Sequence, residues 1–276
     1  MKYILNSIVA VMSFLMVACS NDKLQYDTSV VKDFQIQLNG EPWSLNTGIS
    51  TKPIFIYKND GDFFANYSSH YRFALEKGKY HFLATDIPEQ MITSPVNLND
   101  LIIPQAINAD QAVKISAAMP YQSPFETPLL MNILSRTGTL RLKAKDVVAD
   151  PSYTNIKATV EVKRNGYKVI DETFVQNDME VSRIKKTTTG GINYTDDFIL
   201  FQTDDEANNV VIRIEFLNDD MTVVQTKEIS GAFPILANTV TQINFNLNDA
   251  DTPVIESYEL LVNGEVVTSK KANSKH

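Results

Sequence analysis

The stretch IKATVEVK, residues 156–163, alternates apolar and polar side chains at every step. In an extended chain this period of two places Ile156, Ala158 and Val160 on one face and the polar residues on the other. A strand with one core face and one wet face is typical of antiparallel sheets. The stretch therefore predicts a β-strand, and Asn165-Gly166 after it predicts a tight turn back into residues 167–175.

The same alternation recurs along most of the chain, and no apolar stripe of helical period extends over three turns. Two turns are expected, at Asn39-Gly40 and at residues 76–79, while residues 91–107 are irregular and are read as a short helix or a crossing loop. The fold class predicted is all-β, as antiparallel β-sandwiches. The further alternating segments are 34–38, 72–85, 139–145, 210–217, 222–229 and 240–247.

Three prolines fall within residues 119–128, and proline is excluded from central strands. This segment therefore predicts a connector between two domains. The expected limits are 31–128 for an N-terminal sandwich and 129–250 for a C-terminal one. Each is close to the size of a seven-stranded sandwich, about 100 residues.

The amino terminus reads as an export signal. A short positive start precedes an apolar run that ends at Ala18-Cys19 and is too short to span a bilayer. A small residue before a cysteine at this place resembles the bacterial lipoprotein box, which implies cleavage after residue 18 and acylation of Cys19. Residues 1–18 are then the signal peptide and 19–30 a lipidated tether. The alternative is an ordinary secretory signal with an incidental cysteine.

Charge and composition exclude several classes of function. With 33 acidic against 25 basic residues the net charge is −8, which argues against nucleic-acid binding. The single cysteine excludes an internal disulfide and any multi-cysteine metal site. His70, His81 and His276 lack metal-ligand spacing, and acidic groups such as Asp196-Asp197 fit turn chemistry better than calcium binding. No cofactor, metal site or catalytic constellation is predicted.

Aromatic residues are concentrated in the first half of the chain. Two interpretations remain: packing in the core, or stacking on the sugar rings of a glycan. Trp43, which follows Pro42 after the expected hairpin, is a candidate contact. Phe63 and Phe64 are adjacent, so a strand must turn them to opposite faces, and one of them is a candidate contact with a partner or with the other domain.

Residues 251–276 are expected to form a final hairpin or a tail. Tyr258, Leu260 and Val262 alternate with Glu259 and Leu261, so one face can fill a groove. Asn263-Gly264 predicts a turn. An isolated hairpin is marginal in water, so the segment needs a host sheet in its own chain or in a neighbour. A loosely ordered tail is the alternative.

Three stretches resemble the anchoring and accessory subunits of Bacteroidales fimbriae, the family that includes the FimB and minor-fimbrium anchors. These lipoproteins are transthyretin-like sandwiches that resemble subunits at the base of a pilus. The resemblance implies two tandem sandwiches behind the signal peptide and a structural role without catalysis. The stretches are residues 73–84, 134–142 and 235–247.

The predicted function is that of an outer-membrane lipoprotein that anchors or joins a fimbria by strand addition. Its partners would be the membrane, through Cys19, and pilin or other envelope subunits. The cell surface is preferred over the periplasmic face. The alternative is a surface lipoprotein that binds a glycan or another ligand in nutrient uptake, and an enzyme is not expected.

Overall fold

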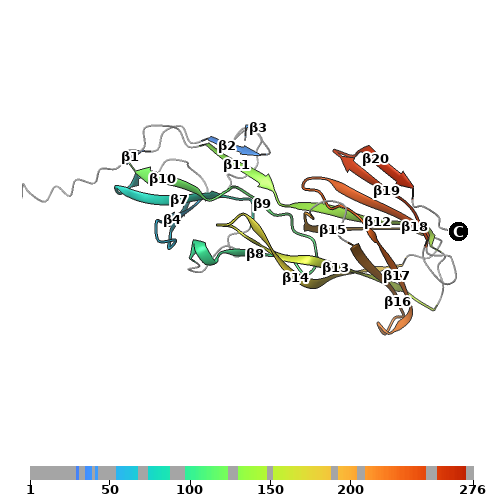
Figure 1. Ribbon diagram of the computed structural model, residues 1–276. Coiled ribbons are helices and arrows are strands. Elements are labelled where there is room, and N and C mark those ends of the chain that lie inside the picture. The colour runs from blue at the N-terminus through green and yellow to red at the C-terminus, as the bar shows by residue number, and fades with distance from the viewer. Residues whose placement is uncertain are drawn as a thin grey trace, which may run out of the picture.

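Strands form nearly all of the regular structure in the computed structural model (Figure 1). The residues it describes are 29–30, 35–38, 41–42, 54–67, 74–87, 97–123, 130–147, 152–187, 192–203, 209–246 and 254–271. They include one short 3-10 turn, η3 (Leu98–Asp100), and no α-helix. The all-β class predicted from the period of two is therefore confirmed.

The described residues of the first half form eleven strands. They are β1 (Ser29–Val30), β2 (Gln35–Leu38), β3 (Glu41–Pro42), β4 (Ile54–Lys58), β5 (Phe63–Tyr67), β6 (Ala74–Leu75), β7 (Gly78–Ala84), β8 (Ile102–Pro104), β9 (Lys114–Ile115), β10 (Met119–Ser123) and β11 (Leu130–Ser135). Two four-stranded sheets result, in the orders β10-β7-β4-β5 and β3-β2-β11-β9, besides a ribbon of β1 and β6.

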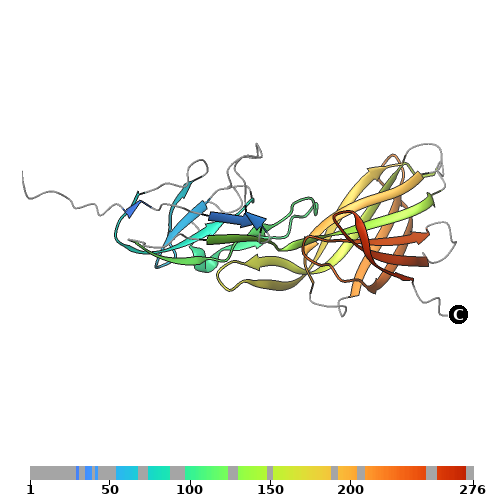
Figure 2. The ribbon, with the colours of Figure 1, turned by 90° about the horizontal axis from the view of Figure 1, so that it is seen from above.

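The second half contains longer strands. They are β12 (Thr137–Val147), β13 (Asn155–Lys168), β14 (Thr173–Lys186), β15 (Ile192–Phe201), β16 (Asn209–Leu217), β17 (Val223–Ala232), β18 (Val240–Asn246), β19 (Val254–Val262) and β20 (Glu265–Lys271). One sheet has the order β15-β12-β18-β19-β20 and the other the order β14-β13-β16-β17. The two groups of sheets lie end to end in an elongated molecule (Figure 2).

Each half buries one face of each sheet against its partner sheet. In the second half the cluster includes Leu140, Ile212, Phe198 and Ile243. In the first half Ile54, Ile56 and Phe82 pack with Met131 and Ile133 of β11. Among the described strands, pairing is antiparallel except for two parallel pairs, β2 with β11 and β12 with β18.

The two halves share a third buried cluster. The tip of the β13–β14 hairpin brings Tyr167 and Val169 against Leu101 and Ile103 of the first half. β8 also pairs with the end of β13, with Ile103 opposite Tyr167. Burial of the Tyr167 hydroxyl raises its pKa to about 12, partly opposed by the positive charge of Arg136.

A buried glutamine reinforces this junction. The side chain of Gln105 donates to the carbonyl of Ile199 at 2.9 Å and accepts from the amide of Phe201 at 3.0 Å. Arg136, which links β11 to β12, forms an ion pair with Glu172 at 2.9 Å. The halves are therefore joined by main chain, side chains and a common core.

Two predicted turns are wrong. β13 runs through Asn165-Gly166 without reversing, and the chain turns after it, at residues 169–172. The cause is close packing: a Cβ on Gly166 would lie 2.7 Å from the Cγ2 of Ile102. The turn at residues 76–79 is also absent, because β6 pairs with β1, while β7 starts at Gly78 and pairs with β4 and β10.

The expected connector is partly a strand. Residues 119–123 form β10, which pairs with β7 at the edge of its sheet, so Pro120 costs little there. The predicted limit at residue 128 stays a prediction, and β11 beyond it pairs with β2 and β9 of the first half. β2 and β3 pair as the Asn39-Gly40 hairpin requires. Residues 1–28 and Trp43 lie outside the described residues.

Candidate functional site: a free sheet edge and a polar recess

The carboxy-terminal hairpin is part of the sandwich of its own chain. β19 pairs with β18, with Tyr258 opposite Ile243 and Leu260 opposite Thr241. Asn263 and Gly264 have φ angles of 52° and 84°, as a two-residue hairpin turn requires. β20 returns along β19 as the outermost strand of the sheet (Figure 1). The host sheet that this segment needs is therefore supplied by β18.

The three predicted contact residues of β19 differ in exposure. Tyr258 packs edge-on against Phe233 at a centroid distance of 5.7 Å, and the Nζ of Lys270 lies 5.7 Å from its ring. Leu260 is half-buried. Val262 is 36% exposed. Tyr258 therefore packs against the core of its own chain, and Val262 is the most exposed of the three.

The outer side of β20 is unpaired within the described part of the chain. Val266 and Val267 are 53% and 60% exposed. We call Val262, Val266 and Val267 the C-terminal edge patch. A strand that combines free backbone groups with exposed apolar side chains is a ready template for another strand. Lys270 and Lys271 at its far end restrict that role to the turn-proximal half.

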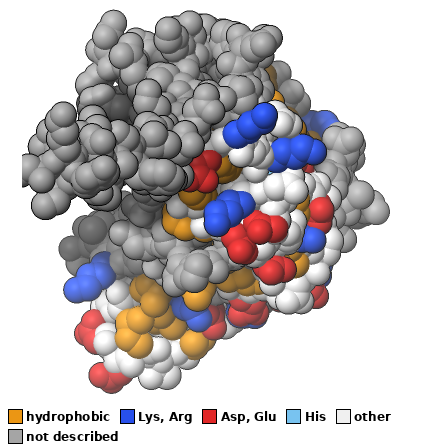
Figure 3. All heavy atoms as spheres, turned by 90° about the vertical axis from the view of Figure 1, so that its left-hand side faces the viewer, with side chains coloured by type: hydrophobic (Ala, Val, Ile, Leu, Met, Phe, Trp, Pro, Cys, Tyr) orange, Lys and Arg blue, Asp and Glu red, His pale blue; other side chains and the backbone are white. Residues whose placement is uncertain are grey.

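Phe63 and Phe64 lie on opposite faces of β5, as predicted. Phe63 packs edge-on against Tyr57 at 5.8 Å, and Phe64 against Tyr80 at 5.7 Å. Each remains partly open, at 36% and 41% exposure. Figure 3, which faces the end of the molecule that carries the first half, shows hydrophobic side chains open to solvent beside charged ones.

A polar recess of about 420 Å³ opens over β7 and β10. Lys79 and His81 are two residues apart on β7 and therefore share a face, with Gln122 and Pro120 opposite them in register. Asn59, just after β4, completes this lining. The intervening Tyr80 and Tyr121 belong to the core cluster of the first half. The prolines of residues 119–128 predict a connector, so the register of β10 with β7, on which this recess depends, does not follow from the sequence.

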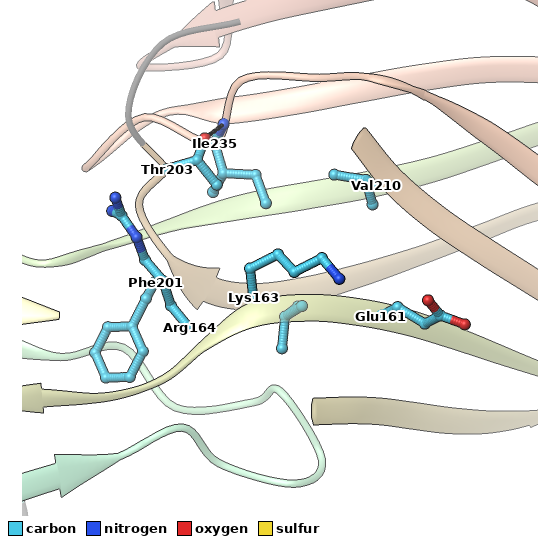
Figure 4. A pocket seen from close by; sticks show the side chains of 8 residues that line it. Glu161, Lys163, Arg164, Phe201, Thr203, Val210 and Ile235 are labelled. Carbon is cyan, nitrogen blue, oxygen red and sulfur yellow. Dashed lines mark hydrogen bonds between the residues drawn. The ribbon is translucent and has the colours of Figure 1, made fainter. Parts of the chain in front are cut away.

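A second cavity lies between the sheets of the second half and holds about 20 Å³, room for one water molecule (Figure 4). At one end the amide of Ile235 donates to the hydroxyl of Thr203 at 2.9 Å. Arg164, only 5% exposed, donates to the carbonyl of Gln202 and lies over the ring of Phe174 at 4.4 Å. The cavity is too small for an organic ligand.

The acidic pair Asp196-Asp197 lies inside β15, so its assignment to a turn is wrong. Asp196 is 1% exposed and binds Arg183 at 3.0 Å and Lys185 at 3.2 Å, both on β14. Asp197 forms a bidentate pair with Arg141 at 2.7 Å. Burial, followed by the charge of Asp196, raises the pKa of Tyr194. Asp219-Asp220, in contrast, does occupy the turn between β16 and β17.

The described residues contain no cluster of three potential metal ligands. Within the same residues, no helix has the length and apolar character needed to cross a bilayer.

Solved structures of proteins from Bacteroides share this fold. A candidate adhesin from Bacteroides ovatus aligns with a TM-score of 0.54 at 9% identity, over 88% of this chain and 96% of its own. Candidate polysaccharide-binding proteins from Bacteroides thetaiotaomicron align with a TM-score of 0.55 at 10% identity, over 87% and 98%. The two-part sandwich architecture is therefore shared over nearly the whole length of these proteins.

The fimbrial anchor protein Mfa2 from Porphyromonas gingivalis aligns with a TM-score of 0.49 at 9% identity, over 86% of this chain and 99% of its own. No family model matches the chain, and no curated protein sequence matches it. The two Bacteroides structures, with TM-scores of 0.54 and 0.55, share the all-β fold that the resemblance implies, at 9% and 10% identity.

Proposed function

We propose that the protein is a lipid-anchored structural subunit that attaches or joins a fimbria at the outer membrane, on the cell surface. It is anchored in the membrane by the acyl chains on Cys19, and it performs no catalysis. Its partner is a pilin or another envelope subunit. Neighbours described as adhesins and as a fimbrial anchor support this class of function.

The unpaired edge of β20 is the surface at which the partner binds in this proposal. An extended partner segment adds to this edge by main-chain hydrogen bonds, while the C-terminal edge patch supplies apolar contacts that select its side chains. β20 is exposed at every position except Thr268, so the partner meets a surface that the described part of this chain does not cover.

Deletion of residues 265–276 tests the proposal. We expect the shortened protein to fold, because β19 keeps its pairing with β18, but to lose co-purification with fimbrial filaments from the cell surface. Deletion of residues 272–276 alone, which leaves β20 complete, is the matched control and should retain attachment. Circular dichroism verifies the fold of both.

The Cys19→Ala variant distinguishes anchoring in the membrane from binding to the filament. It should release the protein from the membrane fraction and abolish lipid labelling, while filament binding persists. Normal filament attachment after loss of β20 would refute strand addition at this edge, and membrane retention of the Cys19 variant would refute the anchor.

A second candidate function is the binding of a glycan at the cell surface in nutrient uptake. The polar recess over β7 and β10 favours it, and one structural neighbour is described as polysaccharide-binding. Its lining, rather than Trp43 or the Phe63-Phe64 pair, offers the grouped hydrogen-bonding side chains that a sugar requires.

A further inference from the structure

The polar recess presents four hydrogen-bonding side chains for which the described part of the chain supplies no partner. Asn59, Lys79 and Gln122 form no side-chain hydrogen bond or ion pair within the described residues, and all three are exposed. His81 is half-buried beside them. Groups of this kind on a strand surface usually bond to water or to a ligand. Because these side chains line one recess, the recess has the features of a binding site.

Two buried polar atoms lie on the same face of the sheet. The Nδ1 of His81 and the hydroxyl of Tyr57 are buried without a hydrogen-bond partner in the described part of the chain. The two residues are directly opposite each other in the pairing of β4 with β7. Burial raises the pKa of Tyr57, so its hydroxyl stays protonated. Buried polar atoms without partners are rare in folded proteins.

The chemistry of the lining defines a ligand class. Lys79 supplies a positive charge, and the described residues that line the recess include no carboxylate. Two amides and an imidazole both donate and accept, which matches the adjacent hydroxyls of a sugar ring. We propose that the recess binds an acidic sugar, a hexuronate, with its carboxylate on Lys79 and its hydroxyls on Asn59, His81 and Gln122. The volume of about 420 Å³ is in the range of small-ligand pockets, about 300–1,000 Å³.

Calorimetric titration of the detergent-purified full chain tests this site with three probes. Glucuronate should bind saturably, whereas glucose, which lacks the charge, and acetate, which lacks the ring, should each bind at least about tenfold more weakly. Lys79→Met should weaken glucuronate binding about tenfold, since it removes one charge-assisted contact. Lys77→Met is the matched control, because Lys77 is exposed two residues away and does not line the recess.

Gln122→Leu provides a second, independent variant at an exposed position that should fold normally and weaken binding. Absence of saturable glucuronate binding overturns the inference. Equal binding of glucose or acetate, or equal weakening by Lys77→Met and Lys79→Met, overturns it as well. The inference rests on the second candidate function and not on the fimbrial one, so its failure leaves the filament experiment unaffected.

Discussion

Gly138, near the start of β12, lies against the main chain of the segment before β18. A Cβ at this position would lie 2.1 Å from the carbonyl oxygen of Leu236, which is main chain and is held in place by the bond from the Asn238 amide to the carbonyl of Thr137. We therefore expect Gly138→Ala to reduce the free energy of unfolding by about 3 kcal/mol, as overpacking does. Urea unfolding followed by circular dichroism measures this.

Gly264→Ala is the control for that substitution. A Cβ there meets nothing within 4 Å, and the residue has a φ of +84°, so only backbone strain of about 1 kcal/mol is expected. Equal losses at the two glycines would show that Gly138 is not tightly packed.

Two Asn-Gly pairs show what a local signal can and cannot predict. Asn263-Gly264 is a hairpin turn with positive φ at both residues, as the sequence indicates. Asn165-Gly166 carries the same letters, but there glycine provides room for Ile102 of β8. The difference depends on a strand about 60 residues away in sequence, which a reading of neighbouring residues does not contain.

At the scale of elements, the edge strands β14 and β15 belong to different sheets and are joined by Asp196. Arg183 and Lys185 of β14 form ion pairs with its buried carboxylate, and the hydroxyl of Tyr194 donates a hydrogen bond to it at 3.3 Å. Asp196→Asn should reduce the free energy of unfolding by about 2 kcal/mol, because hydrogen bonds to a charged group are lost while both cations still reach water.

Asp178→Asn is the comparison for that substitution. Asp178 pairs with Lys163 at 3.0 Å, but its side chain is 79% exposed, so a change of at most about 0.5 kcal/mol is expected. The denaturant midpoints of unfolding of the two variants test this difference. If the midpoints are equal, Asp196 does not join the sheets.

Long strands were predictable and short ones were not. β12, β13, β16 and β18 each carry enough alternation to indicate a buried face. β6 and β9 have two residues each, and β10 contains a proline, so their identity depends on the neighbouring strand. The pattern around Tyr258 predicted a hairpin that needs a host sheet, but not that the outer side of β20 is unpaired in the described residues. The polar recess required the register of β7 and β10.

At the scale of the whole molecule, the sequence indicates two sandwiches but not how closely they are joined. The segment 97–118 crosses between them and contributes to their common core. Its apolar and polar residues do not alternate regularly, so the pattern alone does not predict this role. The end-to-end arrangement in Figure 2 depends on these contacts. Only tertiary structure reveals that β11 and β12 are separated by the single residue Arg136.

This nearly continuous β11–β12 segment determines how the molecule bears tension. β2 runs parallel to β11, and β18 runs parallel to β12. When β2 is pulled toward its amino end and β18 toward its carboxyl end, each strand slides along its parallel neighbour. Shear of this kind loads all hydrogen bonds of a pair together. The β19–β20 hairpin, pulled at its open end through Ser257 and Lys271, peels one bond at a time.

Single-molecule force measurements should therefore give a higher rupture force with handles at residues 28 and 247 than with handles at Ser257 and Lys271. Equal forces would mean that the parallel pairs carry no special load. If the chain is a subunit of a surface filament, as proposed above, it resists extension along its length under flow, while the β19–β20 hairpin opens first.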